Sequence, residues 1–147
     1  MPFHPRTHEF LKSGLYKDIN TFGELEERIA QLSDNQAKGD AFEVFAAALL
    51  ATQRRHDAVM VWPSTTVPPE VLRELNLPDN DFGADGVYRT GIGDFNAYQV
   101  KFRSTRNPLT WTELSTFVGL ADSPNIRCRV LITNCDEVAS ILNKRRG

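Results

Sequence analysis

The segment from Gly86 to Arg103 constrains the fold of this chain more than any other feature. Polar and apolar residues alternate along 95–103, and side chains of a β-strand point to opposite faces in turn, so this stretch predicts a strand. The shorter apolar run 86–89 lies before it, and the turn Gly91-Ile92-Gly93 separates the two. Two such runs around a Gly-rich turn predict an antiparallel hairpin.

The second strand of this hairpin carries Gln99 and Lys101 on one face, because they lie two positions apart. Asp85 comes directly before the first strand, and the hairpin brings its carboxylate to the same face. A carboxylate, an amide oxygen and an ammonium group together suit a divalent metal and a phosphate. Two simpler interpretations stay open: Asp85 is a turn residue, or the other two side chains form the solvated face of a half-exposed strand.

Capping and periodicity predict the remaining elements. Thr21 with Glu24 and Thr110 with Glu113 are capping boxes, each of which opens a helix. We expect helices over 22–33, 36–53, 69–75, from 110 and from 136, and strands over 59–62 and 129–133. Residues 1–20 lack periodicity and contain two prolines, so we expect a loosely ordered arm followed by one domain over 21–147.

Composition limits the classes of protein to consider. The chain has 147 residues, of which 41% are hydrophobic and 24% charged, as in a globular domain with its own core. No apolar run reaches the roughly 18–20 residues of a membrane span, and the N-terminus lacks the apolar region of a signal peptide. We therefore expect a cytoplasmic protein without a membrane partner.

The residues that most often bind transition metals give no site by their spacing. Cys128 and Cys135 are too few for a disulfide framework or a zinc site. His4, His8 and His56 show no spacing typical of metal ligands, so we expect all three at the surface.

Charge is distributed unevenly around the total of −2. Residues 1–85 carry 8 Lys and Arg against 14 Asp and Glu, a net of −6, whereas residues 86–147 carry 9 against 5, a net of +4. The basic half contains Gln99 and Lys101, and a local positive surface there would suit a phosphate backbone. Ordinary scatter of charges accounts for the difference equally well.

Three stretches together resemble the PD-(D/E)xK nuclease superfamily, and most closely its Mrr-like restriction-endonuclease branch. They are 38–43 (KGDAFE) on a helix, 82–87 (FGADGV) at the start of a strand, and 98–102 (YQVKF) on the next strand. The similarity covers roughly residues 36–135. The expected order of elements equals the α-β-β-β-α-β core of that superfamily, so the resemblance implies an α/β fold with a mixed central sheet flanked by helices.

The resemblance implies an endonuclease that hydrolyses DNA phosphodiester bonds with Mg²⁺ or Mn²⁺. Asp85 would be the central metal ligand, Gln99 would coordinate through its side-chain oxygen, and Val100 through its backbone carbonyl. Glu43 would reach the metal through a bound water, and Lys101 would orient the attacking water or stabilise charge on the phosphate. Gln99 stands where many relatives have Glu or Asp, which implies weaker metal binding, although the Mrr-like branch carries this Gln.

Partners follow from the same resemblance. We expect Arg103, Ser104 and Arg106 to contact DNA phosphates, which position a protein without reading sequence. Domains of the Mrr-like branch often precede a helicase or another ATPase in a longer protein, and cutting both strands at once favours a homodimer. Two alternatives stay open: a catalytically inactive nuclease-like module that binds branched or single-stranded DNA, and a protein-interaction domain.

Overall fold

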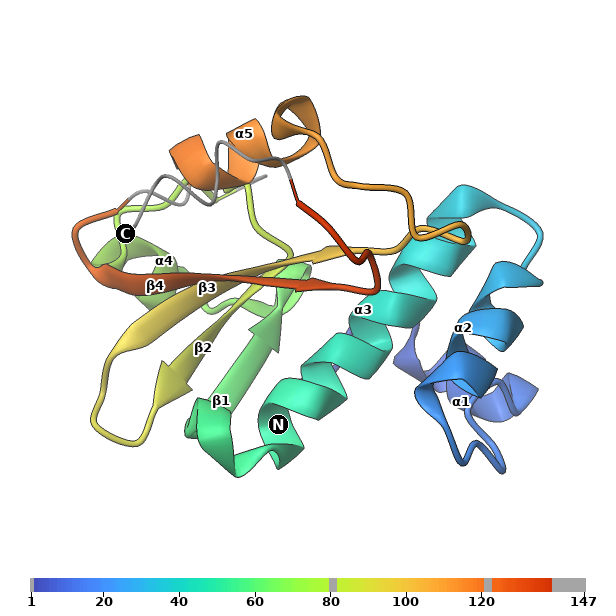
Figure 1. Ribbon diagram of the computed structural model, residues 1–147. Coiled ribbons are helices and arrows are strands. Elements are labelled where there is room, and N and C mark those ends of the chain that lie inside the picture. The colour runs from blue at the N-terminus through green and yellow to red at the C-terminus, as the bar shows by residue number, and fades with distance from the viewer. Residues whose placement is uncertain (1, 80–81, 121–122, 139–147) are drawn as a thin grey trace.

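The computed structural model describes residues 2–79, 82–120 and 123–138 of the chain (Figure 1). Along the chain its elements are α1 (Thr7–Ser13), α2 (Phe22–Ala30), α3 (Asn35–Thr52), β1 (Ala58–Pro63), α4 (Pro69–Glu74), β2 (Gly86–Thr90), β3 (Phe95–Lys101), α5 (Trp111–Leu120) and β4 (Ile126–Thr133). Three helices come first, and helices and strands then follow each other except at the β2–β3 hairpin, which has no helix between its strands.

The four strands form one mixed sheet in the order β1-β2-β3-β4. β1 and β2 are antiparallel, as are β2 and β3, while β3 and β4 are parallel. The predicted hairpin is confirmed, since Gly86 pairs with Tyr98 and Arg89 with Phe95. Gly93 in its turn has φ of 94°, a conformation that favours glycine. The expected α/β class with a mixed sheet is therefore confirmed.

α3 covers one face of the sheet, with α1 and α2 on its outer side (Figure 1). Phe42 of α3 packs against Phe102, with the ring centroids 5.4 Å apart, and against Phe45 at 5.7 Å. Strand residues that point to this face, Tyr98 and Val100 among them, are buried in the same cluster. This cluster is the main hydrophobic core, and it fixes α3 relative to β3.

α4 and α5 cover part of the opposite face. Phe95 stacks on Trp62 with centroids 6.2 Å apart, and Ala97 is buried against Phe117 of α5. The face that also carries Gln99 is therefore not simply a solvated one. Both faces of β3 are packed along most of its length, as expected for a strand in the interior of a sheet.

Some expected elements differ from those observed. Residues 7–13 form a helix where we expected a loosely ordered arm, because Phe10 is only 3% exposed and packs into the main core. The helix expected from Asp136 lies mostly outside the described residues. The capping box of Thr110 and Glu113 is confirmed, since each residue's N–H donates to the other's side chain. Thr21 is confirmed as an N-cap that accepts from the N–H of Glu24, but the Glu24 carboxylate accepts from the N–H of Asn20 instead of that of Thr21. Within the described residues, no helix is long and apolar enough to cross a membrane.

Candidate active site

Asp85 is held at the start of β2 by two contacts to the backbone of β3. Its N–H donates to the carbonyl of Tyr98 over 2.9 Å, and its Oδ2 accepts from the N–H of Val100 over 2.7 Å. Gly86 allows the Tyr98 ring to lie directly against the backbone, where a Cβ atom would overlap the ring. The carboxylate is therefore fixed in position by main-chain hydrogen bonds and by a close aromatic contact.

A polar cavity of about 410 Å³ brings the predicted site residues together. Glu43 lines it from α3 and Asp85 from the start of β2, while Gln99, Val100 and Lys101 line it from β3. Three elements that are distant in sequence thus contribute to one cavity. The β2–β3 hairpin brings Asp85 next to the β3 residues, and the packing of α3 on β3 adds Glu43.

A second cavity, of about 230 Å³, lies beside the first. Asp85, Gln99 and Lys101 line this one too, together with Glu113 and Phe117 of α5. The three side chains are therefore accessible from the α3 side and from the α5 side of the sheet. A ligand with an extended shape would contact them from both directions.

Gln99 and Lys101 have polar groups available for a ligand. Both residues are half-buried, and neither side chain forms a hydrogen bond or ion pair with another described residue. A partly buried amide or ammonium group without a protein partner retains its full capacity to bind a phosphate or a metal.

The carboxyl group of Asp85 is electrostatically unusual. Burial raises its pKa most and the nearby negative charge of Glu43 second, so that the pKa lies at about 7. The hydrogen bond from the Val100 N–H opposes this rise in pKa, as do the charges of Lys101 and His4. A divalent cation in the cavity would favour the ionised carboxylate, because it would offset the repulsion between the two acidic groups.

The donor set in the cavity fits a hard divalent cation. Asp85 and Glu43 supply carboxylate oxygens, Gln99 an amide oxygen and Val100 a backbone carbonyl. Oxygen donors without sulfur suit Mg²⁺ or Mn²⁺ better than zinc. The residues present therefore fit the metal that the sequence resemblance implies.

His4 is buried beside this site, although we expected it at the surface. It is only 9% exposed, and its Nε2 lies 3.1 Å from Oε2 of Glu43. The prediction failed because the contact joins residues 39 positions apart. His8 is exposed and His56 is half-buried.

His4, Asp40 and Glu43 have ligand atoms that all lie within 4.8 Å of one another. Asp40 already has partners for both oxygens: Arg6 donates to Oδ2 over 2.8 Å and Gln36 to Oδ1 over 2.9 Å. These contacts make the group a hydrogen-bond network rather than an open set of metal ligands.

The expected phosphate contacts are less available than the sequence suggested. Arg103 and Ser104 line the first cavity, but Arg103 forms an ion pair with Glu113 of α5. Arg106 is not among the cavity residues, and its Nε donates to Glu26 over 2.9 Å. The structure thus brings two of the three residues to the cavity and pairs both arginines with carboxylates.

Lys38 is a cavity residue for which the sequence pattern predicted no role. It lies on α3, five positions before Glu43, and lines the same cavity. Its place within the 38–43 stretch was the available signal, since residues near each other on one helix can border the same space.

Comparisons with protein-family models, with curated protein sequences and with solved structures found no match for this chain.

Proposed function

We propose that this chain is a metal-dependent DNA endonuclease domain with a restriction-endonuclease-like fold, of the Mrr-like branch of the PD-(D/E)xK superfamily. One observation supports this proposal most strongly. Glu43, Asp85, Gln99 and Lys101, which the resemblance matched to that superfamily's site, line a single cavity. The order α3-β1-β2-β3-α5-β4, with the short α4 inserted between β1 and β2, further supports the proposal, because it follows the α-β-β-β-α-β order of the expected core.

Asp85 and Glu43 have the main role in holding the cation. Their carboxylates approach the cavity from two elements, and Gln99 and the Val100 carbonyl complete a set of oxygen donors. Mg²⁺ bound there would supply Lewis acidity and lower the pKa of a water. Because Gln99 is uncharged, two carboxylates balance the charge of one divalent ion.

Lys101 is placed to act on the phosphate. Its ammonium group shares a strand face with Gln99, two residues away, so it borders the metal ligands. Hydrolysis forms a bond from a water oxygen to phosphorus and breaks a bond from phosphorus to a sugar oxygen. Negative charge accumulates on the phosphate oxygens during this step, and a fixed cation beside them lowers its barrier.

A cleavage assay tests the proposal. The purified chain is incubated with supercoiled plasmid and with single-stranded DNA, in the presence of Mg²⁺, Mn²⁺ or EDTA. We expect metal-dependent cutting that falls at least about 100-fold in Asp85→Ala and in Lys101→Ala. Lys12→Ala is the matched control, because it removes a cation from the exposed surface of α1 and should leave cutting unchanged.

The neutral Gln99 favours a second candidate, a nuclease-like module that binds DNA without cutting it. The same samples separate the two functions. A wild-type chain that never cuts but retards DNA in a gel supports the binding module. A chain that neither cuts nor binds DNA contradicts both and leaves the protein-interaction domain.

The resemblance also leads us to propose a linked helicase or ATPase and a homodimer. The small cavity and the few cations around it support the first idea, since such a domain gains DNA affinity from attached parts. Sedimentation with and without DNA tests the second: we expect a complex whose mass is that of two chains plus one DNA.

A further inference from the structure

The N-terminal segment is attached to α3 by a series of polar contacts. His4 contacts Glu43, and Arg6 donates to Asp40 over 2.8 Å. Tyr16 donates its hydroxyl to the carbonyl of Ala41 over 2.7 Å. All three partners lie within one turn of α3, so this segment is anchored against the part of the helix that carries Glu43.

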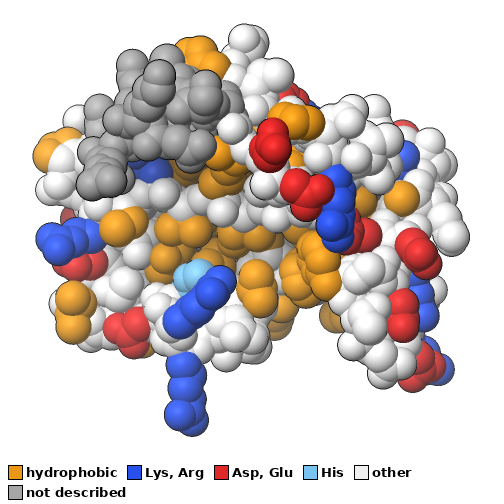
Figure 2. All heavy atoms as spheres, viewed as in Figure 1, with side chains coloured by type: hydrophobic (Ala, Val, Ile, Leu, Met, Phe, Trp, Pro, Cys, Tyr) orange, Lys and Arg blue, Asp and Glu red, His pale blue; other side chains and the backbone are white. Residues whose placement is uncertain are grey.

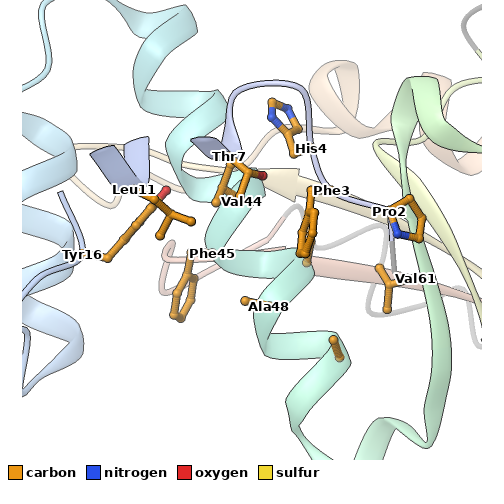
Figure 3. Close-up of a pocket in the computed structure, with 12 residues that line it drawn as sticks. Pro2, Phe3, His4, Thr7, Leu11, Tyr16, Val44, Phe45, Ala48 and Val61 are labelled. Carbon is orange, nitrogen blue, oxygen red and sulfur yellow. The ribbon is translucent and has the colours of Figure 1, made fainter. Parts of the chain in front are cut away.

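The side chain of Phe10 also fixes this N-terminal segment to the core. Phe10 of α1 is buried in the main core, and the Arg6 guanidinium lies 4.7 Å from the centroid of its ring. Figure 3 shows the chain crossing α3 at this point, with the His4 ring turned away from Phe3 and Pro2 of the neighbouring apolar groove. His4 thus borders that groove, while its ring nitrogens belong to the polar network.

The hydrogen bonds of His4 determine which ring nitrogen carries the proton. The backbone N–H of Arg6 donates to Nδ1 over 3.1 Å, and a nitrogen that accepts a hydrogen bond cannot itself be protonated. In the neutral ring the proton then lies on Nε2. His4 therefore donates this proton to Oε2 of Glu43, 3.1 Å away.

This donation constrains the Glu43 carboxylate. Oε2 is engaged by His4, while Oε1 has no hydrogen-bond partner among the described residues. The side chain is about 20% exposed, and the residue lines the cavity. One oxygen is thus held by the protein, and the other is left for a cation or its water.

We propose that His4 is a positioning residue for Glu43, which orients that carboxylate toward the metal through a hydrogen bond from Nε2. The inference rests on the proposed function for its biological meaning, but the contact itself does not. Hydrogen bonds to metal ligands from neighbouring side chains typically change metal affinity about 10–100-fold when they are removed.

Binding of Mn²⁺ to three variants tests the proposal without a cleavage assay. His4→Ala should weaken Mn²⁺ binding about 10-fold, as measured by calorimetry or by the spin resonance of free Mn²⁺. His4→Gln should restore the affinity to within about threefold of wild type, because its amide N–H occupies the place of Nε2. Tyr16→Phe is the matched control: it removes another contact between the segment and α3, and should leave the affinity unchanged.

Nitrogen NMR of the histidine rings gives a second measurement. The His4 ring of the metal-free protein should show a protonated Nε2 and an unprotonated Nδ1. The opposite tautomer would overturn the proposal. Equal Mn²⁺ affinity in wild type and His4→Ala would overturn it too, as would a His4→Gln variant as weak as His4→Ala.

The outcomes separate this inference from the proposed function. Wild-type protein that binds Mn²⁺ but never cuts DNA would refute the endonuclease, while the affinities of the His4 variants would still decide the positioning role. Protein that cuts DNA with the same metal dependence in His4→Ala would refute the positioning role alone. A wild type that binds no Mn²⁺ at millimolar concentration would refute both.

Discussion

The pKa of Asp85 connects the candidate chemistry with the stability of the fold. In the unfolded chain an aspartate titrates near 4, whereas in the folded protein burial and Glu43 raise the pKa to about 7. Between these values the folded state holds a proton that the unfolded state has released. Stability that is present below about pH 4 is therefore lost as the pH rises through 7.

Asp85→Asn should remove this pH-dependent loss of stability. The amide oxygen can still accept from the Val100 N–H, while the buried negative charge is gone. At pH 8 we expect the free energy of unfolding to rise by about 1–2 kcal/mol, less than the full linkage value because Asp85 is only partly buried. Near pH 4 the variant and wild type should be about equally stable.

Urea denaturation in EDTA at both pH values measures this difference. Asp18→Asn, which removes an exposed carboxylate, controls for the change in net charge. A wild type that is no less stable at pH 8 than its Asp85→Asn variant would show that the carboxyl has an ordinary pKa.

Gln99 sets the charge of the candidate metal site. Replacement by Glu adds a third carboxylate to the donors that line the cavity, beside Asp85 and Glu43. At pH 8 we expect Gln99→Glu to bind Mn²⁺ about tenfold more tightly, since an added negative charge near a divalent ion contributes at least ~1.4 kcal/mol. Calorimetry compares it with Gln99→Met, which has no oxygen donor and should bind more weakly than wild type. Equal affinities in all three proteins would exclude Gln99 from the metal site.

At the scale of elements, the β2–β3 hairpin depends on a close contact between Gly86 and Tyr98. The Tyr98 ring is only 1% exposed, so it cannot move aside for a Cβ atom at position 86. Gly86→Ala should lower the free energy of unfolding by about 2–3 kcal/mol and displace the neighbouring Asp85. Thermal or urea denaturation measures the loss.

Gly119→Ala is the matched control for this substitution. A Cβ atom there meets nothing within 4 Å, and the residue lies in α5, where alanine is favoured over glycine by about 1 kcal/mol. The two changes should therefore have opposite signs. A Gly86→Ala variant as stable as wild type would show that the Tyr98 contact is not a constraint.

Local patterns predicted most elements because their causes are local. Alternation along 95–103 predicted β3, and the Thr21 and Thr110 capping boxes predicted where α2 and α5 begin. α1 was missed because one buried residue, Phe10, holds it to the core, and a single residue creates no periodicity.

The same reasoning explains which site residues were found. Asp85, Gln99 and Lys101 follow from a hairpin whose register the turn determines. Glu43 required the resemblance, since only the packing of α3 brings it near. His4 left no signal in the sequence, because its role depends on a contact between residues 39 positions apart.

For the molecule as a whole, the distribution of charge limits how DNA could bind. On the face seen in Figure 2, hydrophobic side chains gather at the centre, and Lys and Arg lie scattered around them and toward the edges. The cavity is lined by three cations, Lys38, Lys101 and Arg103, the last of them paired with Glu113. A few phosphate contacts are therefore expected rather than a long basic stripe.

Few phosphate contacts imply a shallow salt dependence. Two or three of them predict that the logarithm of the duplex association constant falls with the logarithm of salt concentration at a slope of about −2 to −3. Lys38→Ala should reduce the slope by about 1 and weaken binding equally for unrelated DNA sequences, because a phosphate contact reads no bases.

Fluorescence anisotropy in EDTA, where no cutting occurs, measures both the slope and the affinity, and Lys12→Ala should match wild type. A slope steeper than about −6 would mean that DNA contacts far more of the surface than this cavity, and an unchanged slope in Lys38→Ala would place the phosphates elsewhere.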